Sequence, residues 1–410
     1  MHRNLLFAWV FAVALLSVAC SSSSEETGAS GGSRDAVSGS HPVVVLLMDG
    51  VRVDHIGAYG TADSATPNLD AFAGRAIRFD WAFSQAPDAG VSLASLLTGL
   101  YPTTHGLVES NDRLVDDAVT LPEALAGAGL ESAAFLTSSG PFEGRGLEQG
   151  FDVFEAGSAA LDGALQWIGQ NADLDFFLVV DLGAVDPAAI DIDNPDESYA
   201  EQVGVLDLAA KRVLDALDAA GLGDRATIAV VSLSGFDLGE HGEAGEPSLY
   251  APETHVPMLL RSPGLGLAKS VDKIVEVVDL GPTLLALVGE EPAAELQGRS
   301  LIGLVQGTGT PPYVAFGEAV GEQGGYFAAL GGYRLVVRGA EGASELYELT
   351  SDPAEQVDLA ASEADRVAVL EDYLNAWKKM VSVASLDPER RTEELDEEAL
   401  EQLRSLGYIQ

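Results

Sequence analysis

The sequence predicts an α/β fold in which helices cover parallel strands on both faces. The first observation is a continuous apolar run from Val43 to Met48, which is typical of a strand that is buried on both sides. The second is the alternation of strand-like and helix-like segments that follows this run. The third is the composition: 410 residues, 47% hydrophobic and 21% charged, are sufficient for a large core.

Hydrophobic periodicity predicts the elements that follow. Short apolar runs indicate strands, and apolar residues spaced three or four apart indicate helices. The predicted strands are Ser132–Leu136, Phe176–Val180 and Thr227–Val231, and the predicted helices are Leu121–Gly129, Ala159–Ile168 and Tyr199–Ala220.

The composition changes near Pro311, so we predict a main domain over residues 42–310 and a smaller one over 311–410. Two strand candidates, Tyr333–Val337 and Glu345–Glu348, precede a helix at Ala364–Trp377. They predict a small antiparallel sheet that packs against this helix. An acidic helix at Asp396–Leu406 is expected to close the chain.

The N-terminus has the pattern of an export signal. His2 and Arg3 precede an apolar run, and Ser17-Val18-Ala19-Cys20 fits a bacterial lipobox. Cys20 is the only cysteine, which excludes an intramolecular disulfide. We predict a signal peptide over 1–19, lipidation at Cys20 and a flexible tether over 20–41, which would place the protein on a bacterial cell envelope, at the periplasmic or outer surface. Simple secretion and a retained anchor are the alternatives.

The charge restricts the possible partners. The chain has 64 acidic and 22 basic residues and a formal net charge of -42. This excess excludes nucleic acid as a partner, and it disfavours polyanions such as sulfated glycans unless a local basic pocket overcomes the overall field. Adaptation to a salt-rich habitat would also explain the acidity.

The stretch Ala86–Leu107 is the candidate functional centre of the protein. Pro87 and Gly90 predict a loop, and Ser92 is then expected to cap a short apolar helix that ends at Gly99. A loop that leads into a helix N-terminus is suited to binding an anion. Asp49 ends the first predicted strand, at the edge where open α/β sheets place their sites.

Several motifs resemble the sulfatase family of the alkaline-phosphatase-like superfamily. SLASLLTGLYPTTHGL is similar to the family signature, in which C-x-P-S-R leads into A-S-L-L-T-G-x-x-P-x-x-H-G. VRVDHIGAYG, VDLGPTLLALVG and ELYELTSDPAEQVDLA match further family patterns in the same order, so the resemblance covers roughly residues 42–410. It implies a sandwich with a large mixed sheet between helices and a small C-terminal antiparallel sheet.

The resemblance also implies where a sulfatase site would lie. In the family, the first residue of C-x-P-S-R becomes the formylglycine nucleophile and the arginine helps to hold it. Alignment places Ala89 at the nucleophile and Leu93 at the arginine. Asp49 matches a metal-ligand position, although Gly50 stands where a second aspartate is common. The active-site motifs are therefore degenerate.

Four further positions differ from the family pattern. Leu233 and Ser234 occupy two other metal-ligand positions, and Asp186 and Glu246 fall near positions where relatives have histidines. His241 and His255, by contrast, lie in segments that do match the family, so they are our candidate binding residues; structural roles are the simpler interpretation of both.

These differences predict a pseudo-sulfatase that binds a ligand or a protein partner in the former cleft. Calcium or magnesium needs about six oxygen ligands, so Asp49 would form only a weak and incomplete metal site. Ala89 has no nucleophilic atom. The favoured hypothesis, a pseudo-sulfatase, therefore has no catalytic residue and no cofactor.

Two alternatives remain open. The first is an active sulfuric or phosphoric ester hydrolase, with Ser92 as nucleophile and Ca²⁺ or Mg²⁺ held by Asp49, Asp54 or Asp186. The second is a purely structural envelope protein.

Other polar residues have simpler interpretations. If they are not ligands of a rearranged site, Asp54 and His55 are expected in a turn. A cluster of acidic residues would either hold calcium or form a solvated loop: Asp191, Asp193, Asp196 and Glu197.

Overall fold

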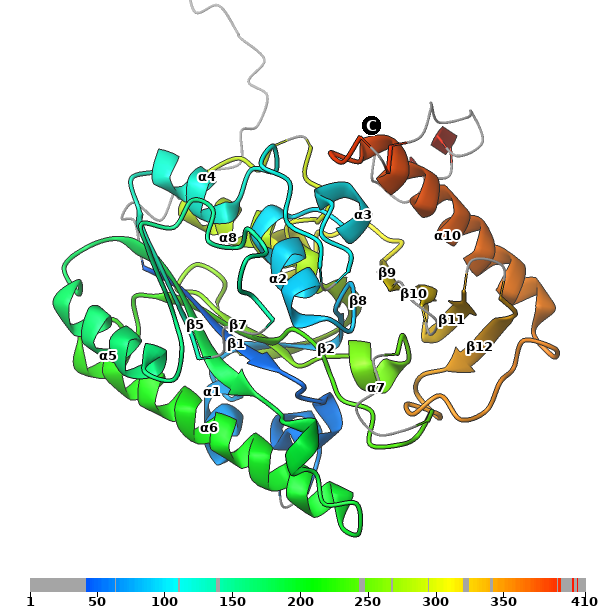
Figure 1. Ribbon diagram of the computed structural model, residues 1–410, viewed down its shortest axis with the longest axis horizontal. Coiled ribbons are helices and arrows are strands. Elements are labelled where there is room, and N and C mark those ends of the chain that lie inside the picture. Colours follow the sequence, from blue (N-terminus) through cyan, green and yellow to red (C-terminus); the bar gives the residue numbers. More distant parts are fainter. Residues whose placement is uncertain are drawn as a thin grey trace, which may run out of the picture. The chain divides into compact units, whose positions relative to one another are not determined.

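Strand β1 (Val43–Asp49) lies in the middle of an eight-stranded sheet in the computed structural model (Figure 1). It pairs in parallel with β5 (Phe176–Ala184) on one side and with β6 (Thr227–Ser232) on the other. Successive side chains of a strand point to opposite faces, and those of β1 contribute alternately to two separate hydrophobic cores. The continuous apolar run was therefore a correct signal of a strand covered on both faces.

The structure describes residues 42–388 except 63, 110, 138–140, 243–247, 267, 294, 320–323 and 340–341, and also residues 390–391, 400–401 and 404. All of them belong to one compact unit, residues 39–410. The predicted signal peptide, Cys20, the tether, Glu246 and most of the predicted helix Asp396–Leu406 lie outside the described residues. In the part of the chain that is described, no helix combines the length and the apolar character needed to span a bilayer.

The large sheet has the strand order β4-β3-β5-β1-β6-β7-β2-β8. Strand β7 runs antiparallel to both of its neighbours, β6 and β2, while the other strand pairs are parallel. The sheet is therefore mixed, as the resemblance implied. The strands not yet bounded are β2 (Ile77–Phe83), β3 (Glu131–Leu136), β4 (Val153–Ala156), β7 (Met258–Arg261) and β8 (Lys269–Glu276).

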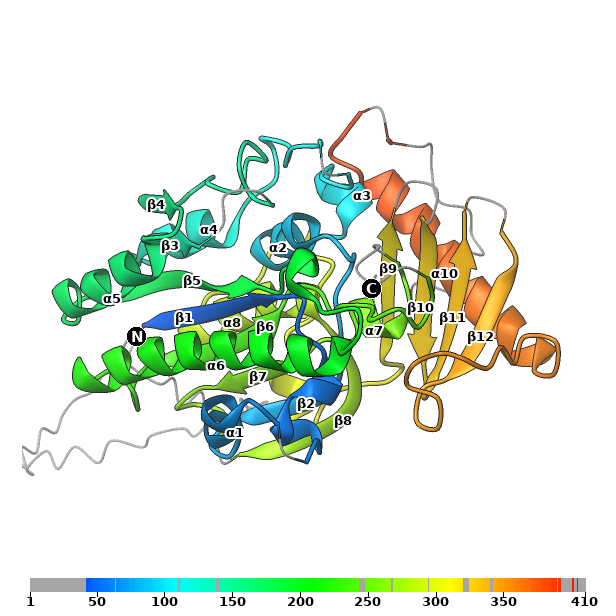
Figure 2. The same cartoon turned by 60° about the horizontal axis from the view of Figure 1, so that its bottom comes forward.

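Helices cover both faces of this sheet, which confirms the expected sandwich (Figure 2). One face carries α2 (Ala89–Thr98), α4 (Leu121–Gly127) and α8 (Leu280–Val288), and the opposite face carries α1 (Pro67–Ala73), α5 (Ala160–Gln170) and α6 (Pro195–Ala219). Short helical segments connect these layers: α3 (Pro102–His105), α7 (Ala251–Thr254), α9 (Ile302–Val305), η1 (Val53–His55), η2 (Gly57–Tyr59), η3 (Pro187–Ala189) and η4 (Val277–Asp279).

A second, antiparallel sheet follows α9, and the predicted domain boundary near residue 310 falls between them. Its strand order is β12-β11-β10-β9. Helix α10 packs on one face, where Trp377 stacks on Phe316 with ring centres 5.3 Å apart. The predicted small C-terminal sheet is thus confirmed. The elements are β9 (Val314–Ala319), β10 (Gly325–Leu330), β11 (Tyr333–Arg338), β12 (Ser344–Glu348) and α10 (Ala364–Ala384).

A buried ion pair within the C-terminal region also forms hydrogen bonds with α7, which belongs to the large domain. Arg334 of β11 and Glu355 have no exposed side-chain surface, and their charged atoms are 2.9 Å apart. Arg334 also donates hydrogen bonds to Thr254 Oγ1 at 2.6 Å and to the carbonyl of Leu249, both at α7 or directly before it. The position of the small sheet is therefore fixed by polar contacts as well as by packing.

The predicted start of the central helix was wrong. Helix α2 begins at Ala89, and its N-cap is Asp88, whose carboxylate accepts a hydrogen bond from the amide of Val91 at 2.9 Å. Ser92 lies inside the helix and donates to the carbonyl of Ala86 at 2.9 Å. The carboxylate that precedes the helix reaches the free amide first, so Ser92 has no capping role. The predicted end is confirmed, because Gly99 adopts a φ of 66°.

The long helix also begins earlier than predicted. Helix α6 starts at Pro195, which brings Asp196 and Glu197 into its first turn rather than into the expected acidic loop. Acidic side chains are favourable there because the helix N-terminus carries a partial positive charge.

Candidate functional site

Asp49 lies at the carboxyl-terminal edge of the large sheet, next to the loop that follows β6. The pairing of Met48 with Ser232 places the two segments after these strands side by side. Ser234 Oγ donates a hydrogen bond of 2.6 Å to Asp49, and the amide of Gly50 donates to the same hydroxyl at 3.2 Å. Asp49 and Ser234, which align with two metal-ligand positions of the family, are therefore in direct side-chain contact.

The environment of Asp49 favours its neutral form. Burial is the main cause, and it raises the pKa of Asp49 to about 6, against the effect of the Ser234 hydrogen bond. The negative charges of Asp181 and Asp88 raise it further. Asp181 comes from the neighbouring strand β5 and accepts a hydrogen bond of 2.7 Å from Thr137 Oγ1. The carboxyl groups of Asp181 and Asp88 thus lie near enough to this edge for their charges to act on Asp49.

The start of α2 is occupied by an internal ion pair. Arg145 Nη1 lies 2.7 Å from the carboxylate of Asp88, and Arg145 Nη2 donates to the carbonyl of Glu109 at 2.9 Å. Arg145 is almost fully buried. At the position that aligns with the family's arginine, Leu93 is buried in the hydrophobic core. The guanidinium group at this helix start therefore comes from a residue far along the chain.

A second cluster of charged side chains surrounds Arg52, a residue that lies shortly after Asp49 in the sequence. Its guanidinium contacts both carboxylate oxygens of Asp54, at 2.9 and 2.8 Å, and Glu240 at 2.6 Å. Burial works against the charge of Asp54, but the hydrogen bonds and charge of Arg52 prevail and hold the pKa of Asp54 below its ordinary value. His55 packs edge-on against Tyr199. Asp54 and His55 lie in the short 3-10 turn η1, as expected of turn residues.

His241 is held by polar partners on both ring nitrogens. Nδ1 lies 3.0 Å from the carboxylate of Asp237, Nε2 lies 3.0 Å from the carbonyl of Glu355, and the ring stacks on Tyr250. Both partners are acceptors, so they favour the doubly protonated ring. Although burial opposes the charge, these hydrogen bonds raise the pKa of His241.

His255 is held between aromatic rings. Its ring stacks on Trp81 and Phe83, with centres 5.0 and 5.1 Å away, and Nε2 lies 2.9 Å from the carbonyl of Asp80. Burial lowers the pKa of His255 to about 4, so the ring is neutral at pH 7. The hydrogen-bond partners and stacked rings of His255 are different from those of His241, and the binding role of both histidines stays a prediction.

Glu253 of α7 is a buried acid that the sequence did not reveal as a candidate. Burial raises its pKa to about 8, and the nearby charges of Asp237 and Asp49 raise it further. Its carboxylate accepts a hydrogen bond from the amide of Asp237 at 2.9 Å. Sequence reasoning also missed Asp181, for which a signal was present: it interrupts the apolar run of β5.

The other predicted acidic positions lie on the surface. Asp186 is exposed and accepts a hydrogen bond from the amide of Ala188 at 2.9 Å. Asp191 similarly accepts from the amide of Asp193. Within the described ranges, no three His, Cys, Asp or Glu side chains are grouped closely enough to hold a metal ion.

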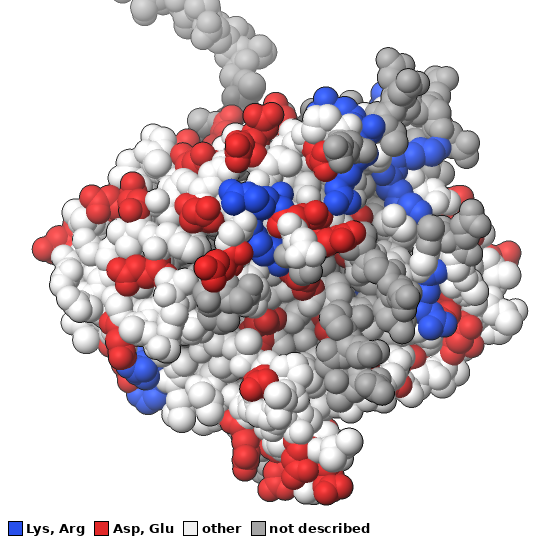
Figure 3. All heavy atoms as spheres, viewed as in Figure 1, with Lys and Arg blue, Asp and Glu red and all other residues white. Residues whose placement is uncertain are grey.

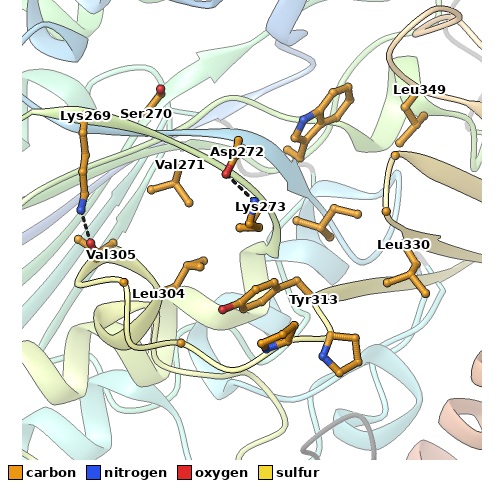
Figure 4. A pocket seen from close by; sticks show the side chains of 18 of the residues that line it. Lys269, Ser270, Val271, Asp272, Lys273, Leu304, Val305, Tyr313, Leu330 and Leu349 are labelled. Carbon is orange, nitrogen blue, oxygen red and sulfur yellow. Dashed lines mark hydrogen bonds and ion pairs between the residues drawn. The ribbon is translucent and has the colours of Figure 1, made fainter.

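A cavity of about 890 Å³ opens elsewhere, between β8, the loop after α9 and the turn joining β10 to β11 (Figure 4). Lys269 donates to the carbonyl of Val305, and Lys273 pairs with Asp272 at 2.8 Å. Trp81 lines this cavity and stacks on His255. None of the predicted site residues lines it.

The close approach of Arg145 to α2 generates a testable prediction for Gly90. A β-carbon at Gly90 would lie 2.2 Å from Arg145 Nη1 and 2.4 Å from the carbonyl of Pro141. Gly90→Ala should therefore destabilise the protein by about 1–3 kcal/mol, despite the better helix propensity of alanine. Gly169→Ala in α5 is the matched control, because nothing lies within 4 Å of its added methyl group. Urea unfolding measures both, and equal stability of the two variants would contradict the tight contact.

Comparisons with known proteins agree with this architecture. The family model described as Sulfatase matches residues 41–163 and 158–290. A Sulfatase from Formosa agariphila is 23% identical over 401 residues, which covers 72% of this chain and 78% of that protein. Arylsulfatase K from Xenopus laevis is 25% identical over 178 residues, covering 40% of this chain and 33% of its own length.

Solved structures show the same fold. The phosphonate monoester hydrolase of Agrobacterium radiobacter superposes with a TM-score of 0.71 at 17% identity, covering 87% of this chain and all of that one. A protein solved in complex with its substrate D-glucosamine-2-N,6-O-disulfate gives a TM-score of 0.72 at 18% identity, covering 86% of this chain and all of that one. The family match extends over more than half of the sequence, and the chain belongs to the sulfatase family, within the alkaline-phosphatase-like superfamily.

Proposed function

We propose that this sulfatase-family protein is catalytically inactive and that it binds a ligand or partner at the carboxyl-terminal edge of the large sheet. The start of α2 carries the proposal. There the methyl group of Ala89 stands at the aligned nucleophile position, and Asp88 and Arg145 satisfy each other's charge beside it. A nucleophilic mechanism requires an attacking atom, which alanine does not have.

The groups around Asp49 do not suit a calcium or magnesium ion, which the family implies. Such an ion takes about six oxygen ligands, commonly several carboxylates. Here Asp49 accepts a hydrogen bond from Ser234, and Leu233 is buried in the hydrophobic core. Gly50 has no side chain, and its φ of 73° disfavours a replacement. We therefore derive no reaction step through a metal.

The contacts of the alternative residues also support inactivity. In the active-hydrolase alternative Ser92 would be the nucleophile. Its side chain is fully buried and donates its hydrogen bond to the carbonyl of Ala86. Asp54 is engaged by Arg52, and Asp186 accepts a backbone hydrogen bond at the surface. The third reading, a purely structural envelope protein, predicts no ligand at the sheet edge.

The pKa of Asp49 gives a test that separates the active hydrolase from the two inactive alternatives. Without a cation, the folded state binds more protons than the unfolded chain between the ordinary pKa of 3.8 and about 6, so stability falls as the pH rises through this window. Asp49→Asn removes this penalty. The variant should be up to about 3 kcal/mol more stable than the natural protein at pH 7.5 and similar below about pH 4.

Urea unfolding at several pH values, with calcium present or with chelator, measures this difference. A cation bound to the Asp49 carboxylate would reverse the sign, because Asp49→Asn would then lose a ligand and destabilise the protein at neutral pH. That reversal, abolished by chelator, would support the active-hydrolase reading.

The second test measures turnover directly. The purified protein should hydrolyse aryl sulfates, phosphate diesters and phosphonate esters no faster than buffer does, with or without calcium, magnesium or manganese. Ion-dependent turnover that disappears in Ser92→Ala would show that the protein is an active hydrolase. The same ion-dependent turnover retained in Ser92→Ala would show an active enzyme with another nucleophile.

We also propose that the protein is exported and attached to the bacterial envelope by lipid at Cys20, since the lipobox-like Ser17-Val18-Ala19-Cys20 supports such processing. Mass spectrometry of the mature N-terminus should show diacylglycerol on Cys20, and Cys20→Ser should move the protein from the membrane fraction to the soluble one. An unmodified mature N-terminus would contradict lipidation.

A further inference from the structure

Strand β8 is the outermost strand of the large sheet and pairs with β2 on one side. The strand at the edge of a sheet presents a row of backbone N–H and C=O groups that its neighbour does not use. In the part of the chain that the structure describes, no backbone hydrogen bond joins residues 269–275 to any segment other than β2. The outer side of β8 can therefore accept one more strand.

This open edge lies away from Asp49. The strand order places β8 four positions from β1, and neighbouring strands are about 4.8 Å apart, so β8 is about 19 Å from β1. A ligand on the outer side of β8 would therefore occupy a place distinct from the site at Asp49.

A cavity follows this edge. The chain after α9 contacts β8 at two places, where Lys269 donates to the carbonyl of Val305 and where the amide of Phe316 donates to Glu276 Oε1 at 2.9 Å. Between these contacts lies the cavity of about 890 Å³ (Figure 4). Residues 269–274 of β8 all line it, which corresponds to about 20 Å of extended chain. We call this cavity the β8 groove.

The walls of the β8 groove are largely apolar. Val271 pairs with Phe79 and Ile274 pairs with Trp81, so a bulge in β8 brings Val271 and Ile274 to the same face of the sheet. Side chains from other segments complete the wall: Trp81, Leu304, Tyr313, Leu330 and Leu349. Apolar side chains of a bound strand would therefore meet apolar partners.

The charged side chains of the groove are already engaged. Lys273 pairs with Asp272 at 2.8 Å, and Lys269 donates to the carbonyl of Val305. The chain as a whole has a net charge of -42, and acidic side chains are spread over the face drawn in Figure 3. The field of the protein therefore favours a ligand that has no net negative charge.

We propose that the β8 groove binds an extended peptide segment of another protein, which adds to the open edge of β8 as a further strand. In such strand addition, main-chain hydrogen bonds supply the affinity and alternate side chains supply the specificity. A second copy of this chain would bring its own segment after α9 to the same edge, so a single peptide fits the groove better than another sheet. The segment alternates apolar and polar residues and is neutral or basic.

Fluorescence anisotropy with the full-length protein tests the proposal, using the labelled peptide acetyl-KVTVTVK-amide as the probe. This peptide should bind with a Kd on the order of 100 µM or lower. The control peptide has the same sequence and carries an N-methyl group on every central residue, so it keeps the side chains and loses the N–H donors. It should bind at least roughly tenfold more weakly.

Variants of the protein locate the binding in the groove. Gln306 is exposed and lines the groove, so Gln306→Trp should fill part of it and weaken binding by roughly tenfold or more. The matched control is Gln170→Trp, at the exposed end of α5, which should leave Kd unchanged.

Tyr313→Ala removes an aromatic wall of the groove and should weaken peptide binding several-fold. Its matched control is Tyr373→Ala, because Tyr373 is also half-buried and lies on α10. Thermal unfolding of each variant checks that it is folded.

Hydrogen exchange gives a readout that does not depend on variants. Strand addition should slow the exchange of amides in residues 269–275, because the outward N–H groups of β8 gain acceptors. Absence of peptide binding, equal binding of the N-methylated peptide, or equal losses in the control variants would overturn the proposal. Self-association of the protein that protects residues 269–275 without any peptide would also overturn it, and would assign this edge to a second copy of the chain.

Discussion

The pairing of β1 with a parallel neighbour on each side is the constraint on which the rest of the structure depends. Parallel strands end at the same edge, so the chain segments after β1 and β6 and the end of β5 must meet there. Asp49, Ser234 and Asp181 are close for this reason, although they are far apart in the sequence. The apolar side chains of β1 pack into the cores under both helical layers, which fixes the position of this edge between them.

Within that edge, the charged groups are balanced largely by one another. Arg52 is surrounded by Asp54 and Glu240, and Arg145 is joined to Asp88. A buried guanidinium group that already has a carboxylate partner has little capacity left for a sulfate or phosphate ester. This balance supports the proposal that the sheet edge, although rich in charged residues, does not catalyse ester hydrolysis.

A buried ion pair within the C-terminal region supports the hydrogen bonds that attach the small sheet to α7. Removing one member of a fully buried ion pair typically destabilises a protein by about 3–5 kcal/mol, because the remaining charge stays buried. Arg334 and Glu355 form such a pair. Glu355 also has a φ of 56°, uncommon for a residue with a side chain, and its carbonyl contacts His241. The C-terminal sheet therefore helps to hold the loop that follows β6.

The sequence by itself determined the α/β class, half of the strands of each sheet and the aligned positions Asp49 and Ala89. Hydrophobic periodicity is a local property, and the family motifs are contiguous, so both can be read without coordinates. Short or amphipathic strands such as β4 and β8 were missed because their patterns are weak. Only the tertiary structure brought Arg145 to Asp88 and Ser234 to Asp49. Those contacts join residues distant in sequence, and their chemistry arises only when packing removes them from water.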